Sequence, residues 1–304
     1  MQYRFLIILL VLFTSCGLQK RLSQTAQLVQ TTKQQASKEK DKLEETGQIV
    51  DGKLSNGEID SLISQDYDQV LTKLNAHLDS LQKRIGALES FMSAKSNFRG
   101  KLYLKNVAPH LSALDSFNLL KEKREIVYQL VKEAIGLKAF KLFNMAAFFE
   151  PGVYNIPPSA FSKIRQMFTP ALDSLTSFSN KYSEMPKTAR LVFVGYADES
   201  PIAEGGALYN DLSRLAGEQP ASRQELNRVL SQLRASEMMQ NLKILVPEKM
   251  ANFISPQKLK FSYFNYGRGE AHPSTQITDY KPDDERRRIV MFYWAVLPEL
   301  SYLK

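Results

Sequence analysis

A carboxylate and a guanidinium far apart in the chain are the residues best suited to chemistry. Asp198 follows the apolar stretch VFVG (192–195), which is typical of a strand that surfaces at a glycine. Arg234 ends a polar stripe with Asn227 and Ser231 at helical spacing of i, i+4 and i+7. A carboxylate receives an ammonium group, and a guanidinium holds a carboxylate through two parallel hydrogen bonds. Together they suit a ligand that carries both charges.

Two elements must bring these residues together. The segment 189–196 predicts a strand, and Ser222 with Glu225 forms a capping box that begins a helix with an apolar face. A helix packed on a sheet holds its polar rim at the edge of the layer, where the loop 195–200 also lies. The simpler alternative is a structural ion pair between Asp198 and Arg234, worth at most about 1 kcal/mol if exposed. Spacing alone favours that alternative.

The C-terminal half alternates between strand and helix patterns. Strands are predicted at 142–149, 189–196, 258–267 and 286–296, with amphipathic helices over 161–182 and after residue 222. The order is β-α-β-α-β-β, so we expect an α/β sandwich with helices on one face of a sheet over residues 140–304.

A helical region precedes this domain. Eight residues from Tyr67 to Met92 are spaced alternately by four and three, which predicts a long heptad helix, and a second apolar series runs from Val127 to Leu137. We expect a helical hairpin or coiled coil over 61–139. Its simplest role is a spacer; oligomerisation or the binding of a partner protein is the alternative.

The N-terminus has the pattern of a secretory signal peptide. Arg4 precedes the apolar run 5–13, which is too short for a bilayer that needs about 20 residues. The stretch 13–16, Phe-Thr-Ser-Cys, resembles a bacterial lipobox, with Phe13 where Leu is usual. That resemblance implies a signal peptide over 1–15 and acylation, with palmitate among the chains, at Cys16. Residues 16–60 are poor in apolar residues, and we expect a flexible tether.

Composition argues against other classes of function. The net charge of +8 is spread along the chain and mixed with acids, whereas a nucleic-acid binder usually concentrates it. His77, His110 and His272 lack metal-ligand spacing, and there is no nucleophile elbow or phosphate-binding glycine loop. We therefore expect no enzyme, no metal or other cofactor and no nucleic-acid partner.

Three stretches of the C-terminal region resemble the OmpA-like peptidoglycan-binding domain, found in porin-like outer-membrane proteins and Pal lipoproteins. The stretch 195–198, GYAD, keeps the Gly and Asp of the family's G-H-T-D. The stretch 227–235, NRVLSQLRA, matches N-x-x-L-S-x-x-R-A in full. The third, GRGEAHP at 267–273 followed by RRI at 287–289, resembles G-x-G-E-x-x-P and a closing R-R-V.

The resemblance implies non-covalent binding of the peptidoglycan stem peptide. Asp198 would take the ammonium of diaminopimelate, and Arg234 its carboxylate. Asn227 would orient the ligand, and Arg287 and Arg288 would contribute at the edge of the site or be solvated strand residues. The protein would then be a lipid-anchored, periplasm-facing tether between the outer membrane and the cell wall. The alternative is a scaffold that acts through its helical region, with peptidoglycan binding lost or altered.

Two departures from the family pattern affect this site. Tyr196 and Ala197 replace the usual His and Thr. The segment between Asp198 and Arg234 is about twenty residues longer than usual, and the extra piece, about 201–222, would cover the site as a lid or block it. It also carries Arg214 at nearly the usual distance from Asp198, but we reject Arg214 because the capped helix begins after it.

Overall fold

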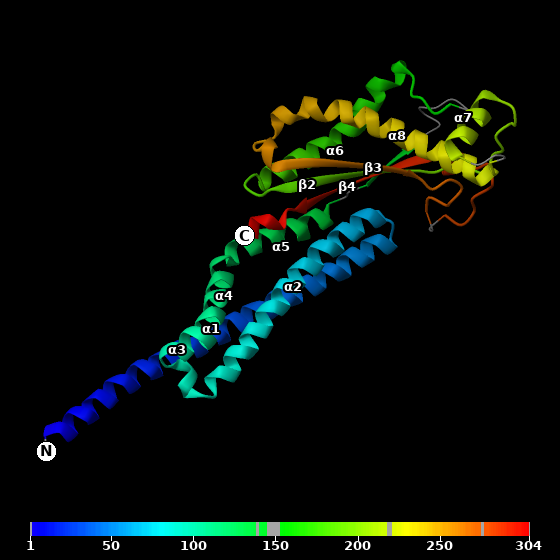
Figure 1. Ribbon diagram of the computed structural model, residues 1–304. Helices are drawn as coiled ribbons and strands as arrows, with labels where there is room; N and C mark the ends of the chain where they lie inside the picture. The colour runs from blue at the N-terminus through cyan, green and yellow to red at the C-terminus, as the bar shows by residue number, and fades with distance from the viewer. Residues whose placement is uncertain (1, 138–139, 145–152, 218–220, 275–276, 304) are drawn as a thin grey trace. The chain divides into compact units, whose positions relative to one another are not determined.

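The computed structural model describes residues 2–137, 140–144, 153–217, 221–274 and 277–303. Its main elements are shown in Figure 1: α1 (Gln2–Ser55), α2 (Ser61–Met92), α3 (Gly100–Leu102), α4 (Ala108–Leu119), α5 (Lys121–Gly136), β1 (Phe140–Asn144), α6 (Phe161–Lys181), β2 (Lys187–Gly195), α7 (Ala207–Ala216), α8 (Arg223–Lys249), β3 (Leu259–Gly267) and β4 (Ile289–Pro298). They form two compact units. The helical unit comprises 1–48 and 68–129, and the sheet unit comprises 49–67 and 130–302.

The helical unit is built from most of α1, α2 and α5, together with α3 and α4. The predicted heptad seam of α2 is confirmed, because all but the last of its eight residues are buried. The second predicted helix is also confirmed, as α5. However, the helical region begins much earlier in the chain than residue 61, since α1 belongs to the same unit up to residue 48.

The flexible tether predicted for residues 16–60 is wrong for residues up to Ser55, which continue α1. This stretch has a seam of its own, spaced alternately by four and three. Its buried members are Thr25, Val29, Thr32, Ala36, Glu39, Leu43, Thr46 and Val50. Half of them are polar, so the pattern of apolar residues in the sequence did not reveal the seam. The side chains of residues 1–16 are not described, and the signal peptide and the acylation of Cys16 stay predictions.

One polar layer crosses the interior of the helical unit. The Arg124 guanidinium donates from Nε to Glu39 Oε2 at 2.9 Å and from Nη2 to Glu39 Oε1 at 3.0 Å. Its Nη1 donates to the Phe117 carbonyl, and the Tyr128 hydroxyl donates to Glu39 at 3.0 Å. Both charged residues are at most 5% exposed. The charge on α1 therefore has its partner on α5, which fixes the relative register of the two helices.

The sheet unit contains a four-stranded mixed sheet in the order β1-β4-β2-β3. β1 and β2 each pair with β4 antiparallel, whereas β2 and β3 pair in parallel, with α8 in the crossover between them. The predicted β-α-β-α-β-β order is confirmed, and α7 lies in the inserted segment. The first strand runs over 140–144, and residues 145–149 of its predicted range fall outside the described residues.

The expected helices, α6 and α8, lie on one face of this sheet, and the other face is covered as well. On one face, Phe168 of α6 packs edge-on against Phe193 and Phe292, with ring centroids 5.9 and 5.5 Å apart. On the other, Arg190 of β2 pairs with Asp66, and Tyr266 of β3 donates to Asp60. All ten residues of β4 are buried as a result. The turn between α1 and α2 and the first residues of α2 therefore belong to the sheet unit and cover its second face.

Candidate functional site

The loops that carry the predicted site residues meet at one edge of the sheet. β2 and β3 are parallel, so their carboxyl ends share this edge, and antiparallel β4 begins there. Backbone hydrogen bonds join the three segments: Ala197 N–H donates to Gly269 O at 2.7 Å, and Tyr196 N–H donates to Ile289 O at 2.9 Å. The carboxyl ends of parallel strands are the usual place for ligand sites in α/β folds.

Two glycines let α8 approach this edge closely. Gly195 and Gly267 are direct partners in the β2–β3 register. A Cβ built at Gly195 would lie 1.9 Å from Ser231 O, and one at Gly267 would lie 2.2 Å from Arg228 O. The Ser231 hydroxyl is fully buried and accepts from Gly269 N–H at 3.0 Å. The glycines of the two loop motifs and the serine of the helix motif thus form one close contact between α8 and the strand ends.

A cleft of about 420 Å³ opens beside that contact. Among the residues that line it are Asp198, Asn227, Arg234 and Arg288. Four of the five predicted site residues outside the N-terminus therefore share one cavity, although up to 90 positions separate them in sequence. Its volume falls within the usual range of small-ligand sites.

Asp198 is the acidic residue of the cleft and is 5% exposed. Its carboxylate accepts from the Ser200 hydroxyl at 3.0 Å and from Ser200 N–H at 3.3 Å. Arg288 Nε lies 3.1 Å from Asp198 Oδ2. Arg288 is therefore a direct partner of the carboxylate, a role that the sequence pattern did not predict. Asp198 is also one of the residues that line the cleft.

Arg234 supplies a second guanidinium to the same cleft and is 6% exposed. Its Nε and Nη2 atoms donate to the Val153 carbonyl at 3.3 and 3.2 Å. Burial lowers the pKa of Arg234 to about 10; the Asp198 carboxylate opposes that shift, and the Arg288 charge adds to it. With two guanidiniums and one carboxylate, these three residues carry a net positive charge, which suits a ligand with at least one carboxylate.

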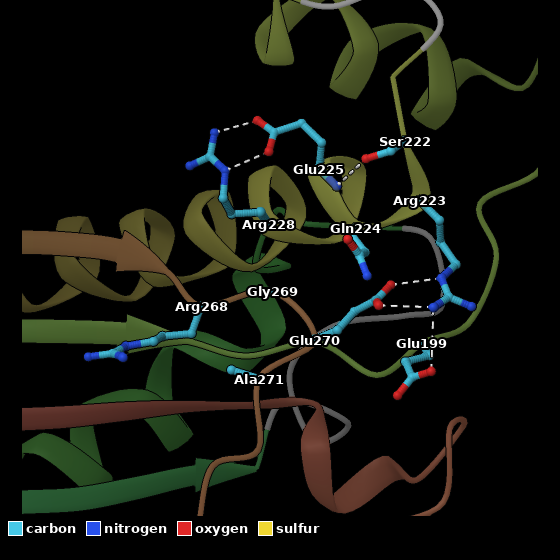
Figure 2. Close-up of a pocket in the computed structure, with 10 residues that line it drawn as sticks. All are labelled: Glu199, Ser222, Arg223, Gln224, Glu225, Arg228, Arg268, Gly269, Glu270 and Ala271. Carbon is cyan, nitrogen blue, oxygen red and sulfur yellow. Dashed lines mark hydrogen bonds and ion pairs between the residues drawn. The ribbon is translucent and has the colours of Figure 1, made fainter.

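Asn227 connects this cleft to a second, more polar groove. Its amide donates to Glu270 at 2.8 Å and to the Ser200 carbonyl at 3.4 Å. Figure 2 shows the groove, in which Glu270 accepts from Arg223 at 2.9 and 3.0 Å and Glu199 lies 3.4 Å from the same guanidinium. Glu270 is the glutamate of the GRGEAHP stretch, so the third motif holds the asparagine of the second.

The structure also locates three other residues that the sequence analysis discussed. Arg287 is 1% exposed and donates to Glu199 at 2.8 Å and to the Glu270 carbonyl, so it braces the loops and is absent from the cleft lining. Arg214 belongs to α7, is exposed and lies 4.0 Å from Asp211, consistent with its rejection. Tyr196 is buried, and burial raises its pKa.

The inserted segment forms one wall of the cleft. Pro201, Ile202, Ala203 and the first residues of α7 line it opposite α8. α7 itself packs on α8 through Leu212, which lies in an apolar cluster with Leu226 and Leu230. A volume of about 420 Å³ remains beside the described residues of the insertion, which favours the lid over a block of the site. Residues 218–220 of the insertion fall outside the described residues.

Comparisons with known proteins give weak structural likenesses. A MotB-like protein from Desulfovibrio vulgaris has 15% identity and a TM-score of 0.27, covering 59% of this chain and 98% of that chain. The cell wall anchor of the T6SS from Pseudomonas aeruginosa has the same identity and TM-score, covering 56% and 96%. At this TM-score the likenesses do not assign the chain to a fold family. No protein-family model and no curated protein sequence matches the chain.

The described residues contain neither a candidate metal centre nor a candidate membrane span. No group of three or more His, Cys, Asp or Glu side chains among them is placed to hold a metal ion. Within the same residues, no helix combines the length and apolar character that crossing a bilayer requires.

Proposed function

We propose that the cleft binds the zwitterionic end of a peptidoglycan stem-peptide residue of the diaminopimelate type without cleaving it. The observation that carries the proposal is the shared lining by Asp198, Arg234 and Arg288. The ligand carboxylate binds Arg234, and the ligand ammonium binds Asp198. The ammonium shares that carboxylate with Arg288, since a carboxylate has about four acceptor positions.

Calorimetric titration with meso-diaminopimelate tests this assignment. Binding is expected for the wild-type chain, and Asp198→Asn or Arg234→Met should each weaken it by about thirtyfold or more, because losing one partner of a buried charge pair costs about 2–5 kcal/mol. Lysine, which has the ammonium but lacks the second carboxylate, should bind much more weakly than diaminopimelate.

Arg214→Ala is the matched control, since Arg214 is an exposed arginine of the same unit outside the cleft. It should leave the affinity unchanged. Retention on isolated cell-wall sacculi extends the test to the polymer. Equal retention of the wild type and an Asp198→Asn/Arg234→Met double variant would refute the proposal.

We further propose that acylation of Cys16 anchors the protein to the outer membrane, with the sheet unit in the periplasm. This proposal is supported by the lipobox-like sequence before Cys16 and by the apolar run that precedes it. Metabolic labelling with an alkyne analogue of palmitate should mark the wild type and leave Cys16→Ser unlabelled. Equal labelling of both chains would place the acyl group elsewhere, and no labelling of either would reject the anchor.

A further inference from the structure

The connection from α2 to α4 in the helical unit exposes an unusual combination of side chains. Residues 95–105 read KSNFRGKLYLK. Leu102 and Leu104 are 47% and 67% exposed. The four basic residues of the stretch are exposed as well: Lys95, Arg99, Lys101 and Lys105. We call these six residues the basic–apolar patch.

The patch has a fixed backbone rather than a loose loop. Phe98, within the stretch, and Val107, just after it, are 1% and 0% exposed, which anchors the stretch in the core. The Asn106 amide donates to Asn97 at 3.1 Å, and the Asn97 amide donates to the Phe91 carbonyl at 3.2 Å. Leu102 and Leu104 are therefore held by the fold in exposed positions, where no described residue of the helical unit buries them.

No acid along the adjoining chain neutralises the patch. The sequence contains no Asp or Glu between Glu89 and Asp115, and none before Glu39 in α1. The first turns of α1 after residue 16 add Lys20 and Arg21, which are both exposed. This end of the helical unit therefore combines a positive field with exposed aliphatic side chains.

The patch lies beside α1 at the level of Arg21. The Arg21 guanidinium lies over the Tyr103 ring, 4.9 Å from its centroid, and Figure 1 shows α3 against α1. Arg21 is only five residues beyond Cys16, about 7.5 Å along a helix at 1.5 Å per residue. Cys16, the residue predicted to carry the acyl chains, is thus a short distance along α1 from the patch.

We propose that the basic–apolar patch contacts an anionic phospholipid surface, with Leu102 and Leu104 at the headgroup–acyl boundary and the basic residues among the phosphates. Interfacial segments of proteins combine these two features: apolar area enters the boundary while Lys and Arg bind acidic headgroups. The contact is a second point of membrane attachment in addition to the proposed acyl anchor. It goes beyond the ligand cleft and does not depend on it.

Vesicle co-sedimentation tests the patch without the acyl anchor. The chain used begins at residue 16 and carries Cys16→Ser, so neither acylation nor the apolar run 5–13 contributes. It should bind phosphatidylethanolamine vesicles containing phosphatidylglycerol, and bind them less as salt rises. Lys101→Gln/Lys105→Gln should weaken binding about thirtyfold, because each basic residue near an anionic surface contributes about 1 kcal/mol. Leu102→Ser/Leu104→Ser should weaken it by about tenfold or more.

Matched controls come from the same unit. Lys73→Gln/Lys83→Gln removes two exposed lysines of α2, and Leu119→Ser removes a leucine that is 83% exposed at the end of α4. Both should bind as the wild type does. Loss of binding in the controls equal to that in the patch variants would overturn the proposal. So would wild-type binding to DNA or RNA without binding to anionic vesicles, which would make the patch a nucleic-acid surface.

Discussion

Buried charges occur in both units of this protein, and they are arranged differently. In the helical unit, Glu39 and Arg124 meet through two parallel hydrogen bonds between packed helices. Tyr128 and the Phe117 carbonyl bind the atoms that remain. In the sheet unit, Asp198 and Arg234 are as deeply buried, but they line a cleft of about 420 Å³.

The difference teaches how to distinguish a structural pair from a binding site. The Glu39–Arg124 pair matches one negative with one positive charge, and both side chains are buried and hydrogen-bonded to each other, so its role is to position helices. The cleft has one carboxylate for two guanidiniums and open volume against all three groups. Charge imbalance and adjacent space are the features that a ligand would use.

The largest expected effect is on the structural pair. Glu39→Leu leaves Arg124 buried without its carboxylate and should lower the free energy of unfolding of the helical unit by about 3–5 kcal/mol. Urea unfolding followed by far-UV circular dichroism measures it. The double variant Glu39→Leu/Arg124→Leu should recover most of that loss, because apolar residues replace both charges.

The corresponding substitution in the cleft, at Arg234, should affect ligand binding much more than stability. Arg234→Met removes a guanidinium whose pKa burial has lowered, so unfolding should change by less than about 1 kcal/mol while ligand affinity is lost. If Arg234→Met instead destabilised the protein as strongly as Glu39→Leu, the cleft arginine would be a structural residue like Arg124, and the comparison would fail.

The sequence predicted the sheet unit better than the helical unit for a physical reason. The strands and α8 carry motifs in which each residue has a geometric role, such as Gly195, Gly267 and Ser231 at the close contact. The buried seam of α1 is half polar, with Thr32 and Glu39 among its members. In the sequence, the alternating spacing of four and three residues is the one sign of this seam. Its stability depends on partners such as Arg124, 85 residues away, which no local pattern reveals.

The sequence predicted which residues line the cleft better than it predicted the contacts that they make. Helical spacing and the motif order brought Asp198, Asn227 and Arg234 together. The pairing of Arg288 with Asp198 and the bracing role of Arg287 were not predictable, because adjacent residues just before β4 point to different environments. Which of two neighbouring arginines enters a cleft depends on the local backbone, and a sequence motif does not specify that.

Glycine-to-alanine substitutions in the two units test the same contrast, with smaller expected changes in stability. Gly267→Ala places a Cβ 2.2 Å from Arg228 O, 2.5 Å from Ser231 Oγ and 2.6 Å from Gln232 N. Two of these atoms are backbone, so α8 must move away from the strand, at a cost of about 2 kcal/mol or more. Since α8 carries Asn227 and Arg234, diaminopimelate affinity should fall as well. Thermal unfolding and the calorimetric titration measure the two effects.

Gly86→Ala in α2 is the control, and its effect should have the opposite sign. Gly86 is exposed within a helix, and a Cβ there meets nothing within 4 Å. Alanine restricts the unfolded chain more than glycine does, so this variant should be more stable by roughly 0.5–1 kcal/mol, with unchanged ligand affinity. If Gly267→Ala were also neutral or stabilising, α8 would not rest on the strand ends as closely as described. The cleft would then not owe its shape to that contact.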